Sequence, residues 1–147
     1  MKKKVLSIFI IVGLSSFGFA SDRFVRDDAK EVVIDTAMNL VWQDNSDTKT
    51  IKKSWEEAID YCESLSLGGY DNWYLPNINQ LYSIVDKSRY NPAIEPTFQN
   101  IAIDHYWSST VSAENSYGAW HIDFTSGSGG WGFGSGGYYI RCVCDND

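Results

Sequence analysis

The chain has few basic residues and only two histidines. Of its 147 residues, 12 are lysine or arginine and 19 are aspartate or glutamate, so the formal net charge is −7. Nucleic acids and anionic membranes attract basic surfaces, and this balance excludes both as main partners. With two histidines and no carboxylate pair expected on an inward face, we expect no transition-metal site and no cofactor.

A recognisable catalytic signature is also lacking. His105 lies close in sequence to Ser108 and Ser109, which superficially supplies a base and a nucleophile. No sharp nucleophile turn accompanies these serines, and nothing marks a third member of a catalytic set. We therefore expect a protein that is not an enzyme.

One long apolar run lies at the start of the chain. Three lysines precede it at residues 2–4, and small residues suited to a signal peptidase follow it at 18–20. We expect residues 1–20 to be a signal peptide and residues 21–147 to form one periplasmic or secreted domain, with no membrane insertion after cleavage. Removing the three lysines would leave nine basic against 19 acidic residues, a formal charge of −10.

Three cysteines belong to the expected mature chain, namely Cys62, Cys142 and Cys144. In an exported protein an even subset normally pairs, so one thiol is left over or links two molecules. The residues alone allow three different pairings.

The first half of the mature chain predicts an opening strand or hairpin and two helices. Residues 32–34 and 40–42 have the composition of short strands. Residues 44–50 are rich in oxygen donors but lack the spacing of a calcium loop, and we interpret them as a solvated turn. Ser54 with Glu57, and Asn77 with Gln80, predict capped helix starts. The two apolar faces expected are Trp55, Ala58, Ile59, Cys62 and Leu65, ended by Gly68 and Gly69, and Ile78, Leu81, Tyr82 and Val85.

The second half predicts an irregular segment at residues 87–104 and then a three-stranded antiparallel meander. Its strands are expected at 105–110, 119–124 and 138–144. Residues 127–137 contain seven glycines, and we expect a long loop there and no regular strand, because glycine forfeits backbone entropy and packing. The order of elements indicates an α+β domain.

Six sequence blocks follow one another in a specific order. They read W-Q-D, S-W-E-E-A-I-D-Y-C, G-G-Y-D-N-W-Y-L-P-N, Y-W-S-S-T, A-W-H-I-D-F and Y-I-R-C-V. Together, over residues 32–143, they resemble the Lcl C-terminal domain, the C-terminal domain of Legionella collagen-like adhesins. The resemblance implies a C-type-lectin-like fold, with two helices packed on a small twisted antiparallel sheet with long loops. It also implies a disulfide between Cys62 and Cys142, a spare thiol at Cys144, and core positions for Trp42, Trp55, Trp73, Trp107 and Trp120.

Departures from related proteins limit which ligands can be inferred from the resemblance. Calcium-dependent lectins use a Glu-Pro-Asn or Gln-Pro-Asp tripeptide, whereas residues 95–97 read Glu-Pro-Thr, so calcium-dependent sugar binding is not expected. The named adhesin domain is associated with sulfated polysaccharides, and a charge of −10 with few clustered basic residues opposes that ligand here.

The glycine-rich segment at 127–137 is the sharpest candidate for a binding site. Trp131 and Phe133 are separated by one glycine, so in an extended segment both rings point the same way and offer a stacking platform. Alternatively, Trp131 folds back and fills the core of its own domain. Further candidate contacts are Tyr117, Tyr138 and Asn115 at neighbouring strand ends, and His121 and Asp123 on the outward face of the middle strand.

We therefore expect an exported recognition or adhesion module that binds a glycan or protein at the cell surface through the glycine-rich loop. The alternative is a structural or assembly component that packs on a partner chain, with Cys144 as a possible link in a dimer.

Overall fold

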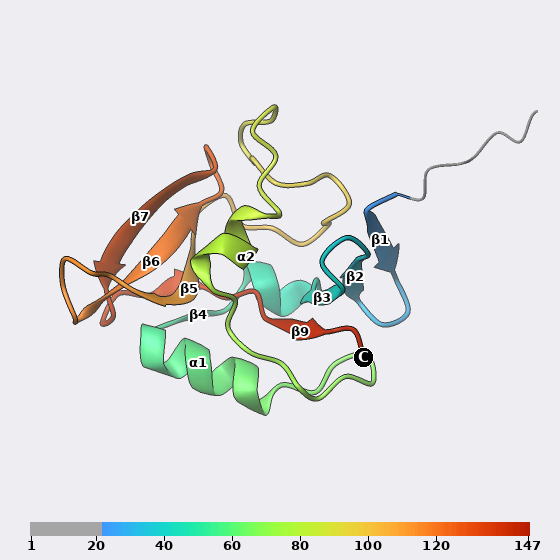
Figure 1. Ribbon diagram of the computed structural model, residues 1–147, viewed down its shortest axis with the longest axis horizontal. Helices are drawn as coiled ribbons and strands as arrows, with labels where there is room; N and C mark the ends of the chain where they lie inside the picture. Colours follow the sequence, from blue (N-terminus) through green and yellow to red (C-terminus); the bar gives the residue numbers. More distant parts are fainter. Residues whose placement is uncertain (1–21) are drawn as a thin grey trace, which may run out of the picture.

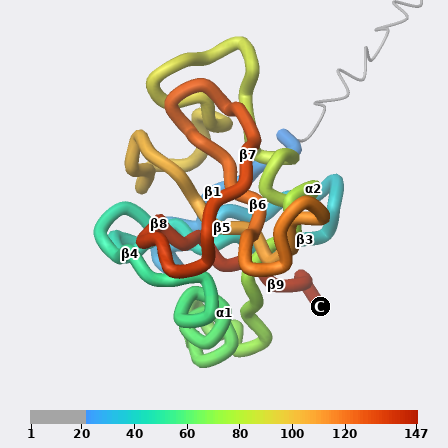
Figure 2. The backbone as a smooth tube through the Cα atoms, turned by 90° about the vertical axis from the view of Figure 1, so that its left-hand side faces the viewer, coloured from blue at the N-terminus to red at the C-terminus, as the bar shows by residue number. Residues whose placement is uncertain are grey.

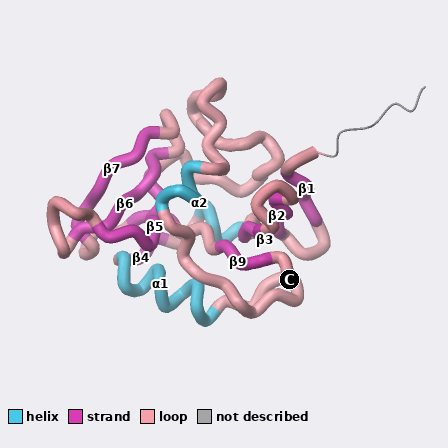
Figure 3. The backbone as a smooth tube through the Cα atoms, in the orientation of Figure 1, coloured by secondary structure: helices cyan, strands magenta, loops and turns pink. Residues whose placement is uncertain are grey.

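The computed structural model describes residues 22–147 and shows an α+β protein with two α-helices and two sheets (Figures 1 and 3). The expected signal peptide at residues 1–20 lies outside the described residues. The strands are β1 (Phe24–Asp27), β2 (Val32–Asp35), β3 (Leu40–Gln43), β4 (Lys52–Lys53), β5 (His105–Val111), β6 (Gly118–Asp123), β7 (Ser128–Phe133), β8 (Tyr138–Tyr139) and β9 (Val143–Asp145). The helices are α1 (Trp55–Ser64) and α2 (Ile78–Tyr82), with a 3₁₀ turn at Ser46–Lys49.

The first sheet joins the two ends of the described chain. Its order is β1-β2-β3-β9, and the predicted hairpin of β2 and β3 is confirmed. The last strand lies antiparallel to β3, with Trp42 opposite Val143. Figure 3 shows these strands together at one end of the molecule, beside the C-terminus.

The second sheet contains the largest departure from the sequence-based prediction. Its order is β4-β8-β5-β6-β7, and the glycine-rich residues expected to form a loop supply β7. This strand pairs with β6 without a break, from Gly118 opposite Phe133 to Asp123 opposite Ser128. The main-chain ladder stabilises the strand, and the missing side chains leave room for neighbouring rings: a Cβ on Gly130 would lie 3.0 Å from Cε1 of His121.

The residues expected to complete the meander connect the two sheets instead. Within residues 138–144, β8 pairs antiparallel with β4 and parallel with β5, whereas β9 belongs to the first sheet. The third strand of the meander is therefore β7, and the prediction of one strand over 138–144 is wrong.

Both helices begin where their capping residues predict. Ser54 and Glu57 form a capping box at α1, and Asn77 and Gln80 form one at α2. Each helix is shorter than its apolar pattern suggests, because α1 ends at Ser64 before the two glycines and α2 has five residues. The turned view in Figure 2 shows α1 as a separate layer on one side of the strands.

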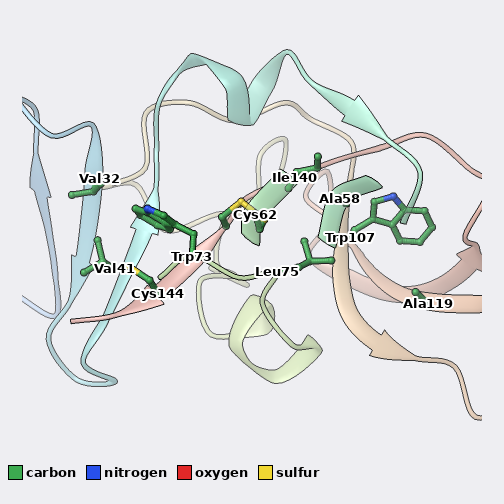
Figure 4. Close-up of a cluster of buried hydrophobic side chains, with 11 residues drawn as sticks. Val32, Val41, Ala58, Cys62, Trp73, Leu75, Trp107, Ala119, Ile140 and Cys144 are labelled. Atoms are coloured by element: carbon green, nitrogen blue, oxygen red, sulfur yellow. A yellow bond between two sulfur atoms is a disulfide. The ribbon is translucent and has the colours of Figure 1, made fainter. Parts of the chain in front are cut away.

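A disulfide between Cys62 of α1 and Cys142 confirms the predicted pairing, with the two Cα atoms 5.5 Å apart. Figure 4 shows this bond inside a cluster of buried side chains that both sheets and α1 supply. The other members of the cluster are Val32, Val41, Ala58, Trp73, Leu75, Trp107, Ala119, Ile140 and Cys144.

The turn after β3 is solvated only in part: Ser46, Lys49 and Thr50 are exposed as expected, whereas Asp44 and Thr48 are buried. Asp44 has no exposed surface and forms ion pairs with Arg26 and with Arg141, whose Nη1 lies 2.8 Å from Oδ1 of Asp44. The backbone amides of Gln99 and Asn100 also donate to this carboxylate, at 2.9 and 3.1 Å. Its partners lie far away in the sequence, so no local pattern reveals them.

Removing the disulfide should destabilise the protein strongly. The bond closes a loop with a sequence separation of 80 residues, for which the chain-entropy model gives a stabilisation of about 4–5 kcal/mol. We expect the Cys62→Ala/Cys142→Ala double variant to lose most of this free energy of unfolding in denaturant titrations. The control is Cys144→Ala, a buried cysteine without a bond, and an equal loss in both proteins would contradict the prediction.

Candidate functional site

The seven predicted binding residues lie on two faces of the β6–β7 hairpin and at its ends. Trp131 lies opposite Trp120, whereas His121 lies opposite Gly130. Since successive side chains of a strand point to opposite faces, Trp131 and His121 lie on different faces of the sheet. A single site that uses both is therefore not formed.

The His121 face is closed by aromatic packing. His121 was expected to be exposed, but it is only 8% exposed. The centroids of the His105 and Tyr138 rings lie 4.7 and 5.0 Å from the centroid of its ring. Burial, with a smaller contribution from nearby His105, lowers the pKa of His121, and its Nδ1 has no hydrogen-bond partner among the described residues. Nearby Asp123 accepts a hydrogen bond from the amide of Thr125 at 2.8 Å. These residues serve packing and a turn.

An ion pair borders this cluster. Nζ of Lys52 lies 3.0 Å and Nδ1 of His105 lies 2.8 Å from the carboxylate oxygens of Asp104. Partial burial raises the pKa of Asp104, but hydrogen bonds from His105 and Lys52 outweigh it and lower the value to about 2.

Trp131 and Phe133 extend from the same face of β7, as predicted. Their ring centroids are 5.6 Å apart in an edge-to-face arrangement, and Nε1 of Trp131 donates to Glu114 at 3.0 Å. Trp131 is half-buried against the backbone of Gly118, where an added Cβ would lie 2.7 Å from its ring, whereas Phe133 is 58% exposed. Trp131 thus lies on the surface of the sheet and supports Phe133 from one side.

A cleft of about 440 Å³ opens beside Phe133, between the start of α1 and two loops. Three aromatic residues line it, Trp55 from α1, Tyr117 from the β5–β6 loop and Phe133 at the end of β7, and Tyr117 is 82% exposed. The rest of the lining is Ser54, Glu56, Ser116, Gly134 and Ser135. Figure 1 shows the start of α1 and the loops at the ends of β6 and β7 on the same side of the molecule.

Hydrogen bonds fix the walls of this cleft. Trp55 donates from Nε1 to the carbonyl of Ser108 and from its amide to the carbonyl of Gly134, at 2.9 and 2.8 Å. The amide of Gly134 in turn donates to the carbonyl of Tyr117 at 2.9 Å. The amide of Tyr117 donates to Oδ1 of Asn115, so Asn115, a predicted contact, shapes the loop that carries Tyr117.

Sequence reasoning missed one wall of the cleft. Trp55 and Trp120 were both expected in the core, but each is only half-buried, whereas Trp42, Trp73 and Trp107 are buried as expected. The available signal was position: Trp55 directly follows the helix cap, and the first turn of a helix has no preceding turn to cover it.

Cys144, the spare cysteine, is buried. Burial, followed by the nearby charges of Asp145, Asp147 and Asp71, raises the pKa of its thiol to about 12, which suppresses the reactive thiolate. A dimer linked through Cys144 stays a prediction, and it requires this part of the chain to open first.

Within the described residues, no group of three or more histidine, cysteine, aspartate or glutamate side chains is arranged to hold a metal ion. Neither helix among residues 22–147 has the length and apolar character needed to cross a membrane.

A family model described as the Lcl C-terminal domain matches residues 31–144. The chain belongs to this family. A search of curated proteins finds no match. The Lcl domain is an adhesin-type domain, and the disulfide of this member is consistent with a location outside the cytoplasm.

Protonation of His121 should destabilise this Lcl domain. Because the pKa of His121 is lowered in the folded state, the unfolded chain takes up a proton first as the pH falls through the ordinary histidine value of 6.5. The free energy of unfolding then falls, by at most about 1.4 kcal/mol per pH unit. The contribution of Asp104, whose pKa is depressed, is lost only at lower pH, between about 4 and 2.

Urea titrations from neutral pH downwards test this expectation with the variant His121→Gln. In the variant, the free energy of unfolding should no longer fall near pH 6.5, but it should still fall at lower pH where Asp104 becomes protonated. If the free energy of unfolding changes equally with pH near pH 6 in the parent and the variant, His121 does not titrate as its burial implies.

Proposed function

We propose that this protein is an exported, non-catalytic recognition module that binds a glycan or protein ligand in the cleft between α1 and the loops that follow β5 and β7. The observation that carries the proposal is the exposure of Tyr117 and Phe133, at 82% and 58%, beside the same cleft. Exposed rings gathered at a hollow are typical of interaction sites, since apolar surface is costly to leave in water.

The chemistry of the lining suits a polar ligand with apolar faces. Aromatic rings stack against sugar rings or against peptide side chains, and the hydroxyls of Ser54, Ser116 and Ser135 can donate and accept hydrogen bonds. The volume of about 440 Å³ falls within the range of roughly 300–1,000 Å³ common for small-ligand sites.

The proposed site refines the expectation from the sequence. Phe133 and Tyr117 remain as direct contacts, Trp55 is added, and Trp131 acts by holding Phe133. We retain the C-type-lectin-like fold as part of this proposal, supported by the family and by two helices packed with antiparallel strands.

The double variant Tyr117→Ala/Phe133→Ala should weaken ligand capture on a glycan and surface-protein array without unfolding the protein. Each ring contact contributes about 0.5–1.5 kcal/mol beyond burial, so losing both should weaken binding by about tenfold or more. The matched control is Tyr90→Ala, which removes a 72% exposed ring from the loop between α2 and β5.

Equal binding by the double variant and the parent would move the site away from the cleft. Absence of any ligand for the parent protein would overturn the recognition role and leave the alternative, an assembly component, which sedimentation of the purified protein as an oligomer would support.

A further inference from the structure

The cleft carries negative charge and no positive charge. Among its lining residues Glu56 is the single charged side chain, and neither lysine nor arginine takes part. Glu56 is exposed in the first turn of α1, and its carboxylate forms no hydrogen bond or ion pair within the described part of the chain. This carboxylate is therefore available to a ligand.

Helix starts often bind an anion through free amides, but most of the amides at the start of α1 already have partners. The amide of Trp55 already donates to the carbonyl of Gly134 at 2.8 Å, and that of Glu57 faces Oγ of Ser54 at 3.4 Å. The carboxylate of Glu57 accepts from the amide of Ser54 at 3.0 Å. Two first-turn carboxylates also offset the positive end of the helix dipole.

The three rings of the cleft come from three separate segments of the chain. Trp55 begins α1, Tyr117 lies in the β5–β6 loop and Phe133 ends β7. The ring contact of Phe133 is with Trp131, and among the described residues no two of the three cleft rings stack on one another. The space between them is open, and the faces of aromatic rings attract cations.

We infer that this cleft selects ligands with a cationic amine, either a protonated amine, as in an amino sugar, or a quaternary ammonium group, as in a choline headgroup. The inference rests on the proposed function and names the ligand chemistry of the same site. The rings attract the cation through their π faces, and the carboxylate of Glu56 adds a direct charge. The acidic net charge of the protein raises the local concentration of cations around it.

The test compares pairs of soluble probes in which one member is a cation and the other is neutral. Choline is matched with its neutral isostere 3,3-dimethylbutan-1-ol, and protonated glucosamine with N-acetylglucosamine, while inorganic sulfate serves as the anion. Binding is followed by NMR titration of the tryptophan indole signals at low salt. We expect the cation of at least one pair to bind about tenfold more tightly than its neutral partner, and the pair that responds identifies an amino sugar or a quaternary ammonium group as the source.

Variants then assign the selectivity to the cleft. Glu56→Gln removes the charge, and Glu63→Gln removes another exposed charge from the other end of α1 as the matched control. We expect Glu56→Gln to weaken cation binding by fivefold or more and Glu63→Gln to leave it unchanged, with unaltered circular dichroism in both.

The outcomes separate this inference from the proposed function. Cleft-dependent capture of neutral or sulfated ligands, lost in Tyr117→Ala/Phe133→Ala and unaffected by Glu56→Gln, would overturn the cation preference and keep the recognition role. If no array ligand and no probe depends on the two rings, both the preference and the role are overturned.

Discussion

The buried carboxylate of Asp44 is the interaction on which the rest of the structure depends. It binds Arg26 of β1 and Arg141 between β8 and β9, and Arg141 also donates to the carbonyl of Gln43 at 2.6 Å. Phe98 lies 4.9 Å from the guanidinium carbon of Arg141, which is fully buried. Charges removed from water destabilise a fold unless they are paired, so the ion pairs of Asp44 hold these distant segments together.

Arg141 is connected to the cleft through the disulfide and α1. The next residue, Cys142, is bonded to Cys62, which holds α1 against the strands. The first residue of α1, Trp55, in turn donates hydrogen bonds to the carbonyls of Ser108 and Gly134. The helix that forms one wall of the cleft is thus held near both of its ends, and such support preserves the geometry of a binding site.

Local signals in the sequence predicted the local structure. Both helix caps, the β2–β3 hairpin and the irregular segment before β5 depend on neighbouring residues, and all are present. The failures concern contacts between distant residues: β7 is stabilised by its ladder with β6, and Asp44 by Arg141, 97 positions away. The same reason explains which parts of the cleft were predicted. The shared face of Trp131 and Phe133 follows from the alternation of side chains along a strand, whereas Trp55 comes beside Phe133 only through the tertiary fold.

The pairing at Asp44 removes charges of both signs from the surface. Of the nine basic residues expected in the mature chain, Arg141 is fully buried, and the side chain of Arg26 is 12% exposed and engaged with Asp44 and Asp28. Asp44 and Asp35 are fully buried as well, so the buried charges cancel and the surface keeps the acidic balance of the composition. A polyanion approaching Glu56 meets repulsion, and a cation meets attraction. The attraction of a cation to the cleft therefore depends on Glu56 and the acidic composition of the surface, whereas the pairing at Asp44 serves the fold.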